Sequence, residues 1–316
     1  MPKTISFILP VYKNESSLQE LHSRLTAVMN KDVKGLDYTM IFVVDGSPDN
    51  SIEVLKKITA KDPSHVRVLS LSRNFGHQAA VTAGIDYATG DAIILMDADL
   101  QDPPQVCPEL IEQWQNGYDV VYAQRRPRKD YPWFRRMLSD MYYGALAKMS
   151  SVDIPRNVGD FRLIDKKVAD VIRSMKEYHR FLRGLVAYAG FKQTAVEFDR
   201  DPRFDDGKTS YSFKKLVQLA KDGIFGFSDS PLRLLAPIGV VGALLSAMVG
   251  LHAFLSWLFW PQLAIPGWGA VIIAVFFVGS LQLIALGVVA EYLGRTYDEV
   301  RRRPTYIVAE EFGDAK

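Results

Sequence analysis

The sequence predicts an α/β protein in which a mostly parallel, doubly wound sheet is followed by amphipathic segments and a hairpin of two transmembrane helices. Three observations support this fold class. Short apolar runs alternate with amphipathic stretches up to residue 124, which is typical of parallel strands joined by helices. Acidic residues directly follow two of the apolar runs. Near the C-terminus, residues 234–290 contain no Asp, Glu, Lys or Arg.

The first part of the chain divides into strands and helices by its hydrophobic period. Short apolar runs bounded by Gly, Pro, Asn or Asp indicate strands, which we expect at 4–11, 38–44, 66–72, 93–96 and 118–124. Apolar residues at helical spacing indicate helices, which we expect at 13–29, 51–60, 76–88 and 105–117. For the first of these helices, Asn14 or Ser16 is a suitable N-cap.

The expected strand at 93–96 leads into a stretch that predicts a metal site. Asp97 and Asp99 follow it at i, i+2 spacing, and Gln101 is a further oxygen donor. Carboxylates placed in this way can bind one hard cation, and Mg²⁺ or Mn²⁺ prefers such oxygen ligands. We therefore expect these three residues to hold Mg²⁺ or Mn²⁺, although a bare Asp-X-Asp also suits an ordinary acidic turn.

Two further carboxylates, Asp45 and Asp160, also lie beside apolar runs. Asp45 ends the apolar run at 38–44 and precedes a Gly-Ser turn, so it is a candidate ligand for the ribose or base of a nucleotide. A plain turn explains the same residues equally well. Asp160, between Gly159 and an apolar Phe-Arg-Leu, is a candidate catalytic group. In doubly wound sheets, ligands bind at the carboxyl ends of the strands, where Asp45 and Asp97 are expected to lie.

Several classes of protein are excluded by what the sequence lacks. It has no G-x-G-x-x-G after the first strand and no G-x-x-x-x-G-K-[ST], which are the phosphate-binding loops of dinucleotide-binding and P-loop proteins. A net charge of +2 gives no global field for binding nucleic acid. The single cysteine, Cys107, excludes an internal disulfide and a cysteine-based zinc cluster.

The block without charges predicts two membrane spans, at about 232–260 and 268–293. Each exceeds the roughly 20 residues that a helix needs to cross a hydrocarbon core of ~30 Å. Arg233 precedes the first span and several arginines follow the second, whereas the connecting turn carries no charge. The positive-inside rule then predicts an integral membrane protein whose termini and α/β domain are cytosolic.

Basic residues mixed with aromatic ones predict segments that lie in the membrane interface. One group begins at Arg125 and Arg128 and continues into the aromatic stretch 131–149. A second covers 203–221, a few residues before the first span. Amphipathic helices of this composition place apolar side chains in lipid and cations against phosphates.

Several motifs occur in an order that resembles one enzyme family. They are PVYKNE (10–15), VVDGSPDNS (43–51), RNFGHQAA (73–80), DADLQDPP (97–104), GDFRL (159–163) and the C-terminal hairpin. Together they resemble the family-2 glycosyltransferases that act on polyprenyl phosphate, such as dolichyl-phosphate mannose synthase, the bactoprenol glucosyltransferases and the aminoarabinose-type undecaprenyl-phosphate transferases. The resemblance covers nearly the whole chain.

The resemblance implies a GT-A fold and an inverting transfer of a sugar from a nucleotide donor, with Mg²⁺ or Mn²⁺ as cofactor. The domains would be a GT-A catalytic domain at 1–200, an interfacial segment at 201–230, the hairpin at 231–294 and a cytosolic tail at 295–316. A homo-oligomer, with a tetramer as one form, is also expected.

The resemblance further implies roles for individual residues. Pro10, Tyr12 and Glu15 would line the nucleobase pocket, and Asp45 would hold the nucleoside. Asp97 would contact the donor and the metal, and Asp99 and Asp160 would be catalytic. The residues that would contact the phosphates of acceptor or donor are Arg125, Arg128, Arg203 and Lys208. The usual Asp-Asp-Gly-Ser reads Val-Asp-Gly-Ser here, and the lysine of the usual Gly-x-Ser-Lys-Tyr is displaced to Lys208.

The expected reaction moves glucose from UDP-glucose to undecaprenyl or another polyprenyl phosphate in the bilayer. GDP-mannose and a UDP-aminoarabinose derivative are alternative donors, and a membrane-anchored protein that binds sugar nucleotides without catalysis is a further alternative. A processive polysaccharide synthase would need more spans and a Gln-x-x-Arg-Trp motif, which the sequence lacks. A sugar-nucleotide pyrophosphorylase would need a glycine-rich, lysine-containing N-terminal loop, which is also missing.

Overall fold

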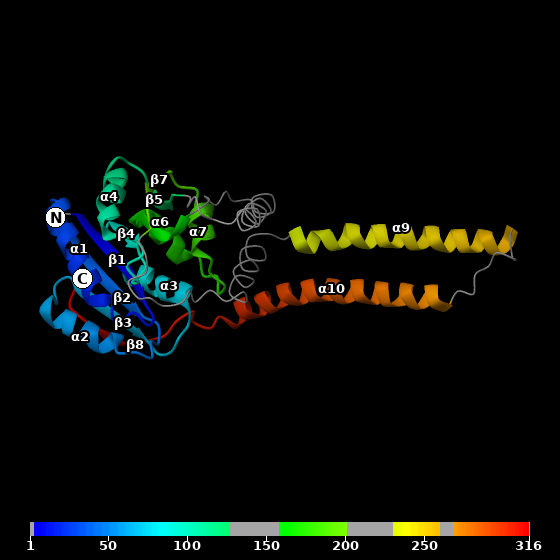
Figure 1. Cartoon of the computed structure of the whole chain (residues 1–316), viewed down its shortest axis with the longest axis horizontal. Coiled ribbons are helices and arrows are strands. Elements are labelled where there is room, and N and C mark those ends of the chain that lie inside the picture. The colour runs from blue at the N-terminus through cyan, green and yellow to red at the C-terminus, as the bar shows by residue number, and fades with distance from the viewer. Residues whose placement is uncertain (1–2, 127–157, 201–229, 260–267, 316) are drawn as a thin grey trace.

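The computed structural model describes residues 3–126, 158–200, 230–259 and 268–315. Within these residues an α/β head carries two long helices that project from one side of it (Figure 1). The N-terminus and the C-terminus both lie on the head (Figure 1).

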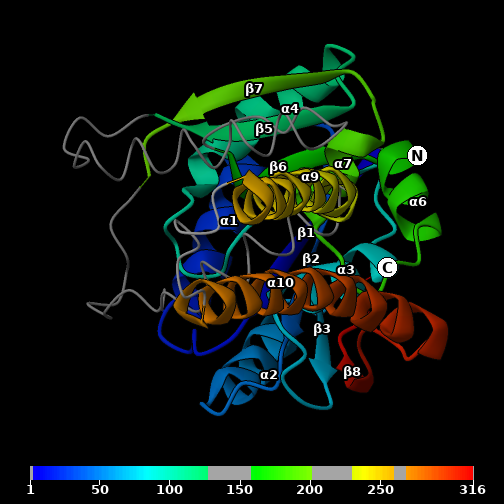
Figure 2. The same ribbon diagram turned by 90° about the vertical axis from the view of Figure 1, so that its right-hand side faces the viewer.

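The head is built on one sheet, whose strands in the described part of the chain have the order β7-β5-β6-β4-β1-β2-β3-β8. β1 is parallel to both β2 and β4, β2 is parallel to β3, and β7 is parallel to β5. β6 is antiparallel to β4 and β5, and β8 is antiparallel to β3. β7 and β8 form opposite edges (Figure 2). The strands are β1 (Lys3–Val11), β2 (Leu36–Val44), β3 (Val66–Leu71), β4 (Ala92–Leu95), β5 (Val120–Arg125), β6 (Val158–Asp165), β7 (Gln193–Phe198) and β8 (Val308–Phe312).

Helices cover both faces of this sheet, which confirms the doubly wound arrangement. Side chains alternate along a strand, so Phe7 joins the core under α1, α2 and α4 whereas Ile8 joins the core under α3, α6 and α7. The helices of the head are α1 (Leu18–Asp32), α2 (Ser51–Lys61), α3 (His77–Tyr87), the 3₁₀ turn η1 (Pro104–Val106), α4 (Cys107–Gln115), α6 (Lys166–Ser174) and α7 (Leu182–Tyr188).

The structure corrects the predicted start of the first helix. α1 begins at Leu18, and its N-cap position is Ser17 rather than Asn14 or Ser16. The Ser17 hydroxyl does not cap the helix: it donates to the carbonyl of Ala98 (2.6 Å) and ties this turn to the DADLQDPP loop. Within the tail, residues 308–312 form the edge strand β8 of the head.

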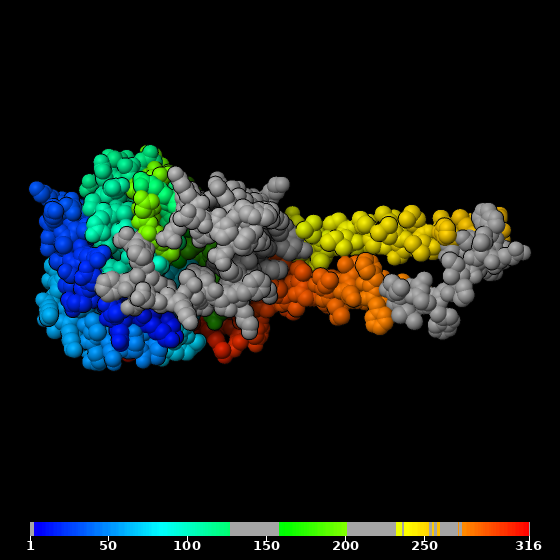
Figure 3. Space-filling view, in the orientation of Figure 1, coloured from blue at the N-terminus to red at the C-terminus, as the bar shows by residue number. Residues whose placement is uncertain are grey.

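The two projecting helices are α9 (Ser230–Phe259) and α10 (Trp268–Arg301). Both are long and apolar enough to cross a membrane. Their apolar side chains are exposed rather than packed in a core: Phe276 is 72% and Leu283 71% exposed. In the space-filling view most of the length of the two helices projects beyond the head (Figure 3). Exposed apolar side chains along two helices of this length indicate a contact with a membrane or a partner.

The strand order places the candidate site. β1 lies between β2 and β4, so the order reverses at the β1/β4 pair. The chain leaves β2 through Asp45, whose N–H donates to the carbonyl of Val11 at the end of β1 (3.0 Å). It leaves β4 toward Asp97 on the other side of β1. Ligands of open α/β sheets bind at such a switch point.

Candidate active site

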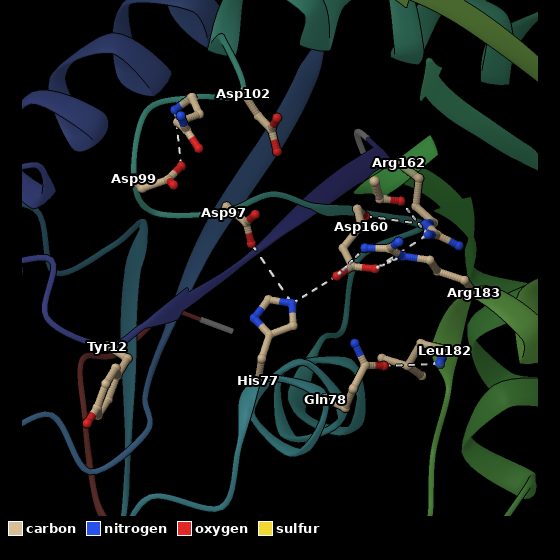
Figure 4. Close-up of polar contacts among 12 residues, drawn as sticks. Tyr12, His77, Gln78, Asp97, Asp99, Asp102, Asp160, Arg162, Leu182 and Arg183 are labelled. Carbon is tan, nitrogen blue, oxygen red and sulfur yellow. Dashed lines mark hydrogen bonds and ion pairs between the residues drawn. The ribbon is translucent and has the colours of Figure 1, made fainter. Parts of the chain in front are cut away.

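Asp97 lies two residues beyond β4 and faces a basic side chain. Its Oδ1 is 3.9 Å from Nε2 of His77, the first residue of α3 (Figure 4). Burial raises the pKa of Asp97, His77 opposes that shift, and the charges of Asp160 and Asp99 raise the pKa further. Burial and two neighbouring acids thus disfavour the charged form of Asp97, and a cation bound to its carboxylate would favour that form.

Asp99 and Gln101 lie in the loop that follows. The backbone N–H of Gln101 donates to Oδ1 of Asp99 (3.1 Å). Leu100 between them has φ = +60°, a left-handed conformation that is uncommon for leucine. Among the described residues, no group of three or more His, Cys, Asp or Glu side chains is arranged to hold a metal. The oxygen donors themselves fit Mg²⁺ or Mn²⁺, and the metal site stays a prediction.

Asp160, on β6, is held by three basic side chains (Figure 4). Arg183 on α7 donates from Nε to Oδ1 (2.8 Å) and from Nη2 to Oδ2 (3.3 Å). Nε2 of His77 is 3.0 Å from Oδ2, and Nη2 of Arg162 is 3.7 Å from Oδ1. Burial alone would raise the pKa of Asp160, but Arg183 and His77 hold it well below its usual range. Asp160 is therefore ionised at neutral pH.

His77 bridges the two acids. Burial would lower the pKa of the imidazole, but the hydrogen bond to Asp160 and the charges of Asp97 and Asp160 raise it to about 9. The ring is therefore protonated at neutral pH, and its Nε2–H donates to Asp160.

Arg162 carries its charge inside the head, with only 1% of the residue exposed. Nη2 donates to the carbonyl of Gly159 (2.7 Å) and Nε to the carbonyl of Asp160 (3.3 Å). Its guanidinium lies 5.1 Å from the ring centroid of Tyr122 on β5. Because a buried charge is unfavourable unless it is paired, Asp160 and Arg162 depend on each other.

A second acid–arginine group surrounds Asp102, which is fully buried. Its Oδ1 lies 3.6 Å from Nη2 of Arg125 and 3.7 Å from Nε of Arg200. Burial and the charge of Asp97 raise the pKa of Asp102 to about 7, although both arginines oppose the shift. This carboxyl gathers two partly exposed guanidinium groups at one place, which suits them to binding phosphate.

Gly159 lies against the guanidinium of Arg125. A Cβ at residue 159 would lie 2.7 Å from Nη2 of Arg125, so the flexible arginine side chain would have to move. The glycine of GDFRL therefore leaves room for a guanidinium from the neighbouring strand β5.

Asp45 is 4% exposed, and its carboxylate accepts from backbone N–H groups. The N–H of Phe75 donates to Oδ1 (2.6 Å) and that of Gly76 to Oδ2 (2.9 Å). Asp45 thus fixes the turn before α3, which places His77. In the adjacent turn, a Cβ on Gly46 would lie 2.4 Å from the backbone nitrogen of Asn74. The nucleoside contact of Asp45 stays a prediction.

The predicted nucleobase residues lie at the end of β1. Pro10 pairs with Val43 of β2, and Tyr12 is 45% exposed (Figure 4). Glu15 accepts from the N–H of Asn50, at the start of α2 (2.7 Å). These residues line the β1 end of the switch point, and their contact with a base stays a prediction. The predicted phosphate contacts Arg128, Arg203 and Lys208 lie outside the described residues.

Comparison with known families decides the class of this protein. Residues 6–173 match glycosyl transferase family 2. The chain belongs to this family. The predicted family, glycosyltransferase activity and GT-A fold are thereby confirmed, in agreement with the observed α/β sheet.

The relatives of this glycosyltransferase match it over nearly its whole length. It is 44% identical to the uncharacterised glycosyltransferase YkcC of Bacillus subtilis (strain 168), covering 98% of this chain and 94% of that protein. It is 37% identical to the prophage bactoprenol glucosyl transferase homolog of Escherichia coli (strain K12), over 96% and 98%. It is 35% identical to the bactoprenol glucosyl transferase of Shigella phage SfII, over 96% and 97%.

Solved structures are similar at a greater distance. Glucosyl-3-phosphoglycerate synthase from Mycobacterium tuberculosis, in complex with phosphoglyceric acid, superimposes with a TM-score of 0.47 at 18% identity. The superposition covers 72% of this glycosyltransferase and 82% of that chain.

Several residues of the glycosyltransferase site were not predicted from the sequence. They are His77, Asp102, Arg162, Arg183 and Arg200. Three of them stand inside quoted motifs: RNFGHQAA contains the histidine, DADLQDPP the buried acid and GDFRL the buried arginine. Arg183 and Arg200 lie in no such motif, so only the fold brings them to the site.

Proposed function

We propose that this glycosyltransferase moves glucose from UDP-glucose onto a polyprenyl phosphate at the cytosolic face of a membrane. One observation carries the proposal. The head contains acids and arginines at the ends of its strands, and two apolar helices long enough to cross a membrane project from it (Figure 1). The sugar and the acceptor are supported by the bactoprenol glucosyl transferases that match nearly the full chain.

The donor would lie at the switch point between β1 and β4. Tyr12 and Asp45 would hold its nucleoside at the end of β1, and Asp97, Asp99 and Gln101 are the residues that would hold Mg²⁺ or Mn²⁺. When bound, such a cation would neutralise the charge that develops on the departing diphosphate.

The acceptor phosphate would be held by arginines. Arg125 and Arg200 present two guanidinium groups around Asp102, and planar bidentate contacts suit a phosphate that must be aligned for attack. A phosphate monoester has a second pKa near 6 and is mostly ionised at neutral pH. The nucleophile therefore needs no strong general base.

Asp160 would orient groups rather than remove a proton. Its pKa is held well below the usual range by Arg183 and His77, so its carboxylate is a weak base. It would keep Arg183 and His77 in place while the bond between the sugar and the diphosphate breaks and the acceptor phosphate attacks the opposite face of the anomeric carbon. This in-line displacement gives inversion.

The membrane face follows from charge. Arg233 precedes α9 and several arginines end α10, whereas residues 234–290 carry no charged side chain. The positive-inside rule supports a cytosolic head and cytosolic termini, and the bacterial and phage sources of the relatives support a bacterial plasma membrane. The interfacial segment at 201–230 and the homo-oligomer stay predictions.

A transfer assay tests the proposal. Purified full-length protein is incubated with undecaprenyl phosphate, Mg²⁺ or Mn²⁺ and, separately, radiolabelled UDP-glucose, GDP-mannose and a UDP-aminoarabinose derivative. We expect label in the lipid fraction from UDP-glucose. Label from another donor alone would replace the sugar assignment, and binding without transfer from any donor would refute the reaction.

A further inference from the structure

We propose that Asp298 and Glu299, in the polar end of α10, are positioning residues for Asp160. The helix that anchors the protein would thereby also set the geometry of the transfer site. The expected effect on catalysis rests on the proposed function. The contacts between α10 and the head do not, because they are part of the folded structure.

α10 is longer than a membrane span requires. Its 34 residues would extend about 51 Å at 1.5 Å per residue, against a hydrocarbon core of ~30 Å. The first acidic residue of α10 is Glu291, and the turns after it are rich in charged residues. The end of the helix therefore continues to the head (Figure 1), where Asp298 and Glu299 contact residues that precede α7.

This polar end contacts the segment that precedes α7. Oε1 of Glu299 accepts from the backbone N–H of Tyr178 (2.7 Å). Oδ2 of Asp298 lies 2.9 Å from Nε2 of His179. Two consecutive residues of α10 thus hold two consecutive residues of the segment between α6 and α7, one of them through its backbone.

The held segment leads directly into the active site. α7 begins at Leu182, whose N–H donates to the side chain of Gln78 (3.1 Å), the neighbour of His77 (Figure 4). The next residue is Arg183, which donates to both oxygens of Asp160. A displacement of the segment would therefore move the arginine that fixes this carboxylate.

The chain beyond α10 holds the other helix that contacts Asp160. The Tyr306 hydroxyl donates to Oδ2 of Asp86 (2.9 Å), near the end of α3. The same helix carries His77 at its start. Tyr306 therefore holds α3, and the end of α10 holds the residues just before α7, so the C-terminal part of the chain contacts both segments that supply these cations to Asp160.

These contacts are poorly placed to stabilise the fold. The side chains of His179 and Asp298 are 34% and 35% exposed, and exposed ion pairs contribute little to stability. Their loss should leave the head folded. The effect expected is on the geometry of α7, and a displacement of about 1 Å at a reacting group can reduce a rate 100-fold.

The test compares full-length variants in lipid nanodiscs, with UDP-glucose and undecaprenyl phosphate as substrates. For Asp298→Ala/Glu299→Ala we expect kcat to fall about tenfold, with the KM for UDP-glucose within about twofold of the wild-type value. Glu299→Gln keeps an oxygen that can accept from Tyr178, and should retain far more activity than Glu299→Ala. Glu310→Gln, which removes an exposed acid from β8, is the matched control.

Hydrogen exchange of residues 182–188 supplies a readout that needs no activity. We expect faster exchange there in the double alanine variant and unchanged exchange in β1. Wild-type exchange in α7, or wild-type kcat in this variant, would overturn the proposal. A variant whose exchange rises throughout the head would also overturn it, because its contacts would then be structural. If wild-type protein transfers no sugar, the proposed function fails. Hydrogen exchange in α7 then decides by itself whether the end of α10 fixes the position of α7.

Discussion

Replacing Asp160 by Asn should destabilise the head, because it removes the negative charge that balances a buried arginine. Arg162 is 1% exposed and lies 3.7 Å from the carboxylate. Asn has nearly the same shape as Asp and can still accept from Arg183, so the change removes charge with little change in packing.

The magnitude follows from the burial of Arg162. Removing one partner of a buried ion pair costs roughly 3–5 kcal/mol. Arg162 keeps its bonds to two backbone carbonyls, so we expect the lower end, about 3 kcal/mol. For a head of this size, that loss corresponds to a fall in Tm of about 6–12 °C.

The stabilisation by Asp160 should depend on pH in a definite direction. The pKa of Asp160 is lower in the folded protein than its reference value of 3.8. The stabilisation is therefore complete above the unfolded-state pKa and is lost as the pH falls through the folded-state pKa. The difference in Tm between wild type and Asp160→Asn should persist from pH 7 to pH 5 and shrink below about pH 4.

Tryptophan fluorescence during heating in detergent measures both effects. Asp170→Asn is the matched control, because Asp170 forms an i,i+3 surface pair with Arg173 and is 55% exposed. It should shift Tm by no more than a degree or two. An unchanged Tm in Asp160→Asn, or a difference from wild type that grows as the pH falls toward 3, would refute the assigned role of the ion pair.

Other substitutions test the remaining parts of the site. Asp97→Asn or Asp99→Asn should lower kcat by about 10²–10³-fold in the transfer assay, and a wild-type rate in either would refute its role. Arg125→Ala should raise the apparent KM for lipid phosphate more than that for UDP-glucose, and an unchanged lipid KM would contradict the assignment. Since the pKa of His77 is raised to about 9, its contribution is complete below the unfolded pKa of 6.5 and is lost as the pH rises to 9. With 41% of its side chain exposed, screening limits that contribution to about 1 kcal/mol, measured as a Tm difference from His77→Asn that disappears at high pH. Calorimetric titration with Mn²⁺ should show weak binding to the free protein and tighter binding when UDP is present, whereas equal affinities would contradict a site completed by the nucleotide.

The parallel half of the sheet could be predicted because each strand is a continuous apolar run with its own turn. The predicted strands at 4–11 and 66–72 differ from β1 and β3 by one residue at one end. β6 could not be predicted in this way, because Asp160 and Arg162 interrupt its apolar pattern and are balanced only by other segments. β8 could not be predicted either, because a polar edge strand has no apolar pattern of its own. It is held by contacts that are distant in sequence, such as the ion pair between Glu311 and Arg67, which lie 244 positions apart.

Residues of the candidate site could be proposed from the sequence where their immediate neighbours indicate a role. They could not be proposed where only tertiary packing brings them to the site. Asp97 and Asp99 were proposed from the sequence because a carboxylate after a buried strand is informative by itself, and the structure places both in the loop that follows β4. Arg183 could not, since it lies in a short helix whose place beside β6 follows from tertiary contacts. The sequence also indicated Asp160 as a candidate catalytic group and left open whether it acts as a base or as an orienting residue. The structure argues for an orienting role, because Arg183 and His77 depress its pKa.

The charges of the site imply that cation and donor bind together. Acids and bases nearly balance in the described part of the site, which contains Asp97, Asp99, Asp102 and Asp160 beside His77, Arg125, Arg162, Arg183 and Arg200. A divalent cation alone would leave this partly buried region strongly positive, which low-dielectric surroundings oppose. A diphosphate brings the opposite charge and further oxygen ligands to the same place. Since no three acidic or histidine side chains are gathered for a metal among the described residues, the missing ligands would come from the donor, so the cation would be retained only while a diphosphate is present for it to neutralise.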